Sequence, residues 1–252
     1  MNTLEQIRVN RQSLKNTAVF YLDRDRTIGL LDDIKVLFFP QCFSGKDIDD
    51  EELLKRISDD LRQEISKVSK DTEAADRIIK RLPIIQDAVY KDVEAIYNGD
   101  PSAKTYEEIV LSFPGFLAVF AYRVAHELYV ENIPVIPRIM TEYAHEKTGI
   151  DINPGATIGE YFCIDHGTGI VIGETATVGN HVRMYHGVTL GVRSFRKDKF
   201  GNLLKGGKRH PDVGDNVILY ANATVLGGDT RIESGSVIPT GSLIIQTPET
   251  FK

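Results

Sequence analysis

The residues with the clearest capacity for chemistry surround His166. Asp165 precedes it directly, and Asp151 lies fifteen residues earlier, nearly the length of one coil in a repeated fold. A carboxylate on one imidazole nitrogen fixes the tautomer and leaves the other nitrogen free to act as a base. A lone histidine is more often structural, but pairing with Asp165 and with Asp151, which we expect to stack close by, favours catalysis when taken with the segment Arg209-His210-Pro211.

A second candidate group, Arg209-His210-Pro211, ends a strongly basic segment. Residues 191–210 contain seven Lys or Arg side chains and one acid, whereas the rest of the chain after residue 150 has three basic and nine acidic side chains. A protruding positive loop could attract a polyphosphate ligand such as coenzyme A. An ordinary solvated loop would explain the same charge.

These candidates lie in a region where apolar residues recur with a period of six. The frame slips by two residues after Ile164 and by one after Val225, and it is broken once, between Leu190 and Val213. A helix cannot maintain this period, and an ordinary strand would alternate by two. The leading positions are Ile152, Ile158, Ile164, Ile172, Val178, Met184, Leu190, Val213, Leu219, Val225, Ile232, Ile238 and Ile244.

Six residues per short strand and turn, with three strands to a coil, is the pattern of a hexapeptide parallel β-helix. Its leading residues point into a narrow triangular core. The flat sides keep exposed edges, so such domains commonly pack as three-fold trimers. His166 and His210 both lie where the frame breaks, and a break is where a coil can open a pocket.

The first 150 residues follow a different pattern. They contain five of the 21 glycines and carry 20 basic and 26 acidic side chains, which suits helices with exposed charged faces. Apolar stripes and stop signals predict helices over residues 47–69, 71–98, 105–130 and 134–147, with Pro83 kinking or splitting the second. Composition alone favours a helical region that serves packing and assembly and contains no catalytic residues.

The fold class is therefore α+β and multidomain. We predict an α-helical domain over residues 1–148, a parallel β-helix over 149–246 with one protruding loop at 191–212, and a short tail over 247–252.

Composition also excludes several classes of protein. Two cysteines cannot form a disulfide framework, and a formal charge of −6 argues against a general nucleic-acid binder. No stretch reaches the roughly 20 apolar residues of a membrane span, and the amino terminus lacks a secretion signal. We expect a cytoplasmic protein without membrane or nucleic-acid partners.

Several motifs resemble those of the serine O-acetyltransferases, a branch of the hexapeptide acyltransferases. The likeness covers residues 98–245 and implies a left-handed coil. It also implies acetyl transfer from acetyl-CoA to the hydroxyl of L-serine, the first committed step of cysteine synthesis. The motifs are D-I-N-P-G-A-T-I-G at 151–159, I-D-H-G-T-G-I-V-I-G-E-T-A at 164–176, V-T-L-G at 188–191, K-R-H-P at 208–211, and G-D-P at 99–101.

The resemblance implies a role for each candidate. His166 would be the general base, with Asp151 orienting it, and His210 would contact the reacting hydroxyl and help stabilise the oxyanion. Arg209 would pair with the serine carboxylate. Asp100 and Asp165 would hold the serine ammonium, which gives the helical half a use that composition does not predict.

The resemblance also implies that Ala221, Lys205 and Lys208 contact acetyl-CoA. Acetyl-CoA is a co-substrate, and no permanently bound cofactor, metal or acyl-enzyme is expected. Cys163 could in principle be an acylated nucleophile, but its place at the end of a hexapeptide favours a structural role.

The partners implied are the two substrates and further copies of the chain, as a homotrimer or a dimer of trimers. Family members that dock into O-acetylserine sulfhydrylase end in isoleucine. This chain ends at Lys252, so no such complex is expected.

Three alternatives stay open at this stage. Another hexapeptide acyltransferase, acting on homoserine, a sugar or an antibiotic, would have the same fold. A trimeric β-helix carbonic anhydrase would bind zinc through three histidines; His181 and His186 have a suggestive spacing, but His145 belongs to the helical half. The third alternative is a catalytically silent scaffold.

Overall fold

The computed structural model describes residues 2–13, 21–43, 49–195 and 197–246 of the 252-residue chain. The predicted tail at 247–252, and with it the argument from Lys252, lies outside the described residues, as does Arg196 of the basic segment.

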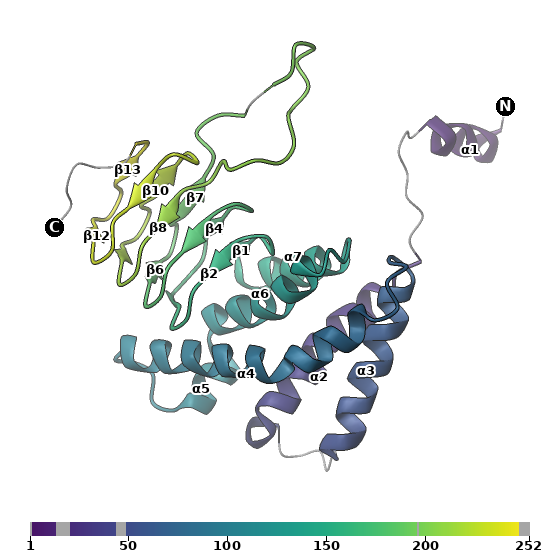
Figure 1. Ribbon diagram of the computed structural model, residues 1–252, viewed down its shortest axis with the longest axis horizontal. Coiled ribbons are helices and arrows are strands. Elements are labelled where there is room, and N and C mark those ends of the chain that lie inside the picture. Colours follow the sequence, from purple (N-terminus) through teal and green to yellow (C-terminus); the bar gives the residue numbers. More distant parts are fainter. Residues whose placement is uncertain (1, 14–20, 44–48, 196, 247–252) are drawn as a thin grey trace.

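The amino-terminal part is helical, as predicted (Figure 1). Helices α3, α4 and α7 confirm the expectations for residues 47–69, 71–98 and 134–147 within a few residues at each end. The helices are α1 (Thr3–Ser13), α2 (Arg24–Phe38), the short 3₁₀ turn η1 (Pro40–Cys42), α3 (Asp50–Ser66), α4 (Ala74–Gly99), α5 (Tyr106–Ser112), α6 (Pro114–Val130) and α7 (Ile136–Thr148).

Helix α4 is not split by Pro83, so the prediction of two separate helices over residues 71–98 is wrong. The helix continues through the proline for 26 residues. Proline removes one backbone hydrogen bond. The apolar residues on both sides of it, including Leu82 and Ile85, are buried in the helical core, so tertiary packing holds the two parts of the helix together.

The single helix expected over residues 105–130 is in fact two. Pro114 disfavours helical geometry in the residue before it, and Phe113 has the extended angles φ −81° and ψ 122°. Helices α5 and α6 meet there at 79°. Within the described residues no single helix is long and apolar enough to cross a membrane, and these two satisfy such a criterion only when joined across their bend.

The carboxyl-terminal part contains thirteen short strands among the described residues. Each carries one of the thirteen leading positions of the six-residue frame, and every leading side chain is buried. The strands are β1 (Asp151–Ile152), β2 (Thr157–Ile158), β3 (Cys163–Asp165), β4 (Val171–Ile172), β5 (Thr177–Val178), β6 (Arg183–Tyr185), β7 (Thr189–Gly191), β8 (Asp212–Val213), β9 (Ile218–Leu219), β10 (Thr224–Leu226), β11 (Arg231–Ile232), β12 (Val237–Ile238) and β13 (Leu243–Ile244).

All pairing between these strands is parallel, and every third strand is a neighbour. The first sheet has the order β1-β4-β7-β10-β13, the second β11-β8-β5-β2 and the third β12-β9-β6-β3. Three strands therefore complete each coil. This arrangement confirms a parallel β-helix with a core of leading residues. The chain between β7 and β8 extends away from the sheets (Figure 1).

The helical part is fastened to the first coil by a buried ion pair. Arg123 of α6 makes two hydrogen bonds to Asp92 of α4, at 2.8 and 3.0 Å, and also donates to the carbonyl oxygens of Ile158 and Gly159 at 2.6 Å. Asp92 in turn accepts the backbone N–H of Phe162 at 2.8 Å. One pair thus joins two helices to the coil.

Replacing Asp92 with alanine should therefore destabilise the protein strongly. The change leaves the Arg123 guanidinium buried without its partner, which costs about 3–5 kcal/mol. Urea unfolding followed by circular dichroism would measure the loss. Asp87→Ala, which removes an exposed ion pair with Lys91 on the same helix, should change stability by about 0.5 kcal/mol or less. Equal effects of the two variants would contradict this account.

Candidate active site

The coil has three rows of corners, and His166, Arg209 and His210 lie on two of them. The histidine corner is formed by the turns 166–170, 186–188 and 220–223, which lead from the third sheet to the first. The loop corner is formed by the turn 173–176 and the segment 192–211, which lead from the first sheet to the second.

His166 projects from the histidine corner. Its backbone has φ +59°, a left-handed conformation that ends β3, and its side chain is 73% exposed. Nε2 lies 3.5 Å from Oδ1 of Asp165, and the ring lies 5.9 Å from that of His186 on the next coil. The imidazole is thus accessible and has a carboxylate beside it.

A cavity of about 520 Å³ lies between this corner and the helical part, and it is lined by Asp100, Asp165 and His166. Asp100 directly follows α4, whereas the other two residues come from the coil. The cavity therefore brings together three of the predicted site residues from both halves of the chain. Its wall also includes Ser102, Phe113, Pro114 and Gly115.

The Asp100 carboxylate is held as an anion. Both the hydroxyl and the backbone N–H of Ser102 donate to its Oδ1, at 2.7 and 2.8 Å. These hydrogen bonds, followed by the charges of His166 and Arg183, lower the pKa of Asp100 below its ordinary value. A second ionised group of opposite sign would therefore be bound well here.

Arg183 of β6 was not identified from the sequence, yet it positions Asp100. Its Nη1 donates to the carbonyl oxygen of Gly99 at 2.6 Å. A Cβ at position 99 would lie 1.9 Å from the Arg183 guanidinium, so a larger residue there would make the guanidinium move. The six-residue frame marks Met184 as the inward residue and gives no signal for its neighbour.

On the loop corner, His210 is buried, with 7% of its surface exposed. The backbone N–H of Thr175 donates to its Nδ1 at 3.1 Å, so Nδ1 is an acceptor and the neutral ring carries its proton on Nε2. Burial, together with the charge of Arg209, lowers the pKa of His210 to about 4. At neutral pH this imidazole is an uncharged hydrogen-bond donor.

Arg209 is tethered by two residues that the sequence did not single out. Its Nη2 forms an ion pair with Oε2 of Glu174, whose Oε1 accepts a 2.8 Å hydrogen bond from the Tyr129 hydroxyl of α6. Hydrogen bonds from Arg209 and Tyr129 lower the pKa of Glu174. The guanidinium is thereby fixed in orientation.

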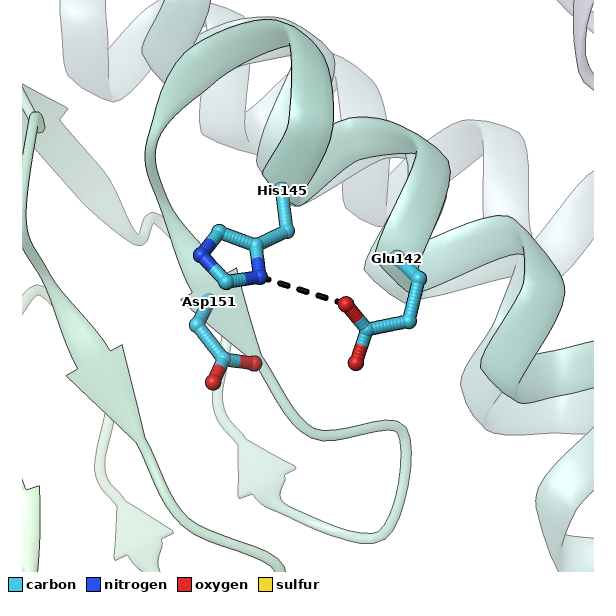
Figure 2. Close-up of side chains that lie close together, drawn as sticks. All are labelled: Glu142, His145 and Asp151. Carbon is cyan, nitrogen blue, oxygen red and sulfur yellow. Dashed lines mark hydrogen bonds and ion pairs between the residues drawn. The ribbon is translucent and has the colours of Figure 1, made fainter.

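The expectation that Asp151 stacks on His166 is wrong. The strand register pairs Asp151 with Val171, twenty residues further along the chain, so His166 lies five residues too early to stack on Asp151. The Asp151 carboxylate lies instead beside Glu142 and His145 of α7 (Figure 2). Among the described residues, Asp165 is the carboxylate that contacts His166.

The predicted acetyl-CoA contacts are divided between the two corners. Ala221 lies on the histidine corner, whereas Lys205 is exposed in the segment 192–211. The Lys208 ammonium donates to the carbonyl oxygen of Thr175 at 2.6 Å and pairs with Asp212. A cavity of about 350 Å³ beside this segment is lined by Lys208 and Arg209, with Gly227 and Gly228 of the coil.

Two other candidates can be placed. Cys163 is buried, and burial raises the pKa of its thiol to about 12, which suits packing and not nucleophilic attack. His181 and His186 lie at opposite ends of β6, about 16 Å apart along an extended chain, so one ion cannot bind both in a single chain.

Comparison with known proteins gives a consistent picture. The family profile described as "Serine acetyltransferase, N-terminal" matches residues 39–121. The "Serine acetyltransferase, plasmid" of Synechococcus elongatus is 45% identical over an alignment of 185 residues, and the match covers 69% of this chain but only 58% of that protein. The serine acetyltransferase of Bacillus subtilis is 39% identical over 161 residues, 64% of this chain and 70% of that protein.

Solved structures agree with these sequences. The native serine acetyltransferase 1 of Entamoeba histolytica superposes with a TM-score of 0.79 and 31% identity, covering 98% of this chain and 94% of that one.

The buried His210 should make folding stability depend on pH. Below about 6.5 the unfolded chain protonates this imidazole, whereas the folded protein does not until about 4, so this residue's contribution to stability decreases as pH falls through that window. Urea unfolding at several pH values should show a smaller decrease for His210→Gln than for the native chain. Identical slopes for the two proteins would contradict the lowered pKa.

Proposed function

This chain belongs to the serine acetyltransferase family, and from that membership we propose that it transfers the acetyl group of acetyl-CoA to the hydroxyl of L-serine, giving O-acetyl-L-serine and CoA. The observation that carries the proposal is the cavity in which an accessible imidazole, His166, adjoins two carboxylates, Asp100 and Asp165. A base beside an anionic subsite suits an acceptor that has both a hydroxyl and an ammonium group.

In the proposed reaction His166 removes the proton of the serine hydroxyl. The hydroxyl oxygen then forms a bond to the thioester carbon, and collapse of the tetrahedral intermediate breaks the carbon–sulfur bond. The protonated imidazole returns the proton to the departing thiolate of CoA. The substrate supplies the nucleophile, so the chain needs only to hold, orient and deprotonate it.

The ammonium and carboxylate groups of the amino acid would each pair with side chains of opposite charge. Asp100 and Asp165 would hold the ammonium, and Arg209, fixed by Glu174, would pair with the carboxylate. The neutral His210 would donate its Nε2 proton toward the oxyanion, because its lowered pKa keeps it a donor without a charge to repel Arg209. Homoserine keeps both charges, whereas a sugar acceptor has neither.

We propose that a second copy of the chain completes this site. His166 and its cavity lie on the histidine corner, whereas Arg209 and His210 lie on the loop corner, one side of the coil away. Packing coils side by side in a trimer would set one copy's loop corner against its neighbour's histidine corner. Asp151 would then orient His166 across the contact, and a dimer of trimers could form through the helical part.

Acetyl-CoA would lie along the same contact. Ala221 shares the histidine corner with His166, and Lys205 and Lys208 belong to the basic segment opposite. We also propose that the chain has two domains, a helical domain over residues 1–148 and a left-handed coil over residues 149–246. Residues 191–212 would form a single loop on that coil. A cytoplasmic location remains a prediction.

Replacing His166 with alanine should lower the rate of acetyl transfer by about 10²- to 10⁴-fold, the usual contribution of a general base. Thioester loss with L-serine would be followed in steady state, and circular dichroism would verify folding. His181→Ala, at a turn on the third row of corners, is the matched control and should retain the native rate. Substantial activity in the His166 variant would remove this residue from the mechanism.

Replacing Asp100 or Arg209 with alanine should raise KM for serine far more than KM for acetyl-CoA, since each change removes a partner of the amino acid's own charges. Asp76→Ala, which removes an exposed carboxylate from α4 outside the cavity, is the control. Running homoserine and a sugar acceptor beside serine would test the competing acyltransferase assignment. An equal rise in both constants would place these residues in another subsite.

A further inference from the structure

A cluster of metal-ligating side chains lies where the helical part meets the coil. Glu142 and His145 project from the last turns of α7, and Asp151 projects from β1 (Figure 2). One ligand atom of each residue lies within 4.8 Å of those of the other two, and Nδ1 of His145 is 3.2 Å from Oε2 of Glu142. None of the predicted roles uses Glu142 or His145.

The backbone holds these side chains in place. Gly149 ends α7 in a left-handed conformation, φ +69°, and its N–H donates to the carbonyl oxygen of His145 at 2.8 Å. This tight turn brings β1 directly beneath the last helical turn. Asp151 is anchored in turn by its backbone N–H, which donates to Ile170 at 2.9 Å.

The Glu142 carboxylate is also oriented. Arg138, one turn earlier in α7, pairs with Oε1, which leaves Oε2 facing His145. Burial raises the pKa of Glu142, but the hydrogen bond with His145 and the charge of Arg138 outweigh it and lower the pKa overall. The carboxylate is therefore ionised at neutral pH and available as a ligand.

We propose that Glu142, His145 and Asp151 form a binding site for a divalent cation of the zinc type. Ligands at zinc's usual distances and tetrahedral angles are about 3.3 Å apart, close to the observed separation of Nδ1 and Oε2. The cation would replace the proton between these two atoms, and a small rotation of the Asp151 carboxylate would supply the third ligand. Water would occupy the fourth position.

The donor set selects the class of cation. One imidazole nitrogen with two carboxylate oxygens suits zinc, nickel or cobalt, whereas magnesium and calcium prefer oxygen ligands alone. The site is open to solution, because the side chains of His145 and Glu142 are 42% and 43% exposed. A cation can therefore enter without local unfolding.

Occupancy would inhibit acetyl transfer. This consequence rests on the proposed function, in which Asp151 orients His166, because a carboxylate bound to a cation is no longer free to do so. The proposed cation site thus shares Asp151, the positioning residue of the proposed reaction, with Glu142 and His145 of α7.

Calorimetric titration of the full chain with Zn²⁺, in the absence of substrates, tests the site directly. One ion per chain is expected, and Co²⁺ should give the visible absorption of a low-coordinate site. His145→Gln and Glu142→Gln should each weaken binding by about tenfold or more. The matched controls His181→Gln, Glu146→Gln and Cys42→Ser should bind as the native chain does.

Loss of binding in His181→Gln or Cys42→Ser with retention in His145→Gln would overturn the site, as would the absence of a one-to-one isotherm. The second arm measures thioester loss with serine at increasing Zn²⁺. Inhibition should follow occupancy in the native chain and shift to about tenfold higher Zn²⁺ in His145→Gln. Unchanged activity of a native chain saturated with Zn²⁺ would overturn the proposed inhibition. If the native chain without Zn²⁺ shows no acetyl transfer at all, the proposed function is refuted, but the result of the binding titration still stands.

Discussion

The narrow core of the coil is the constraint on which the rest of the molecule depends. Three strands close each coil, and each strand has room for one inward apolar side chain, such as Ile164 or Met184, stacked on its equivalent one coil away. Every other residue must face outward or occupy a corner. Functional side chains therefore lie on the outward positions of strands, as Asp165 does, or at the corners, where the chain can leave the frame and where left-handed residues such as His166 occur.

The helical part contributes to the site through fixed contacts with this coil. Arg123 and Asp92 fasten α6 and α4 to the carbonyl and N–H groups of the first coil, and Arg183 reaches back to Gly99 at the end of α4. Asp100 follows that glycine directly. Asp100 and His166 thus line the same cavity because Arg123 fastens α4 to the coil and Arg183 fixes its end, so the helical half forms part of the candidate site as well as a packing module.

The coil was predictable because its period is local: each leading residue repeats the environment of the last, and all thirteen proved to be in strands. The helices were predictable from their apolar stripes, but the break at Pro114 needed the backbone restriction on Phe113. Long-range geometry was less accessible. The stacking of Asp151 on His166 failed because the expectation disregarded the two-residue slip after Ile164, which makes the leading residues Ile152 and Ile172 neighbours twenty residues apart. The roles of Arg183 and Glu174 were not predictable, because they depend on partners far away in the sequence: Gly99 for Arg183, and Arg209 and Tyr129 for Glu174.

The two histidines of the proposed reaction are distinguished by environment and not by residue type. His166 is exposed beside Asp165, so an imidazolium formed there is solvated and has a counter-charge. His210 is buried beside Arg209, and its Nδ1 accepts from Thr175, so it resists protonation and presents only a neutral donor. One fold thereby separates a group that must change charge from one that must not, a division that pairs of titratable groups commonly use in acid–base catalysis.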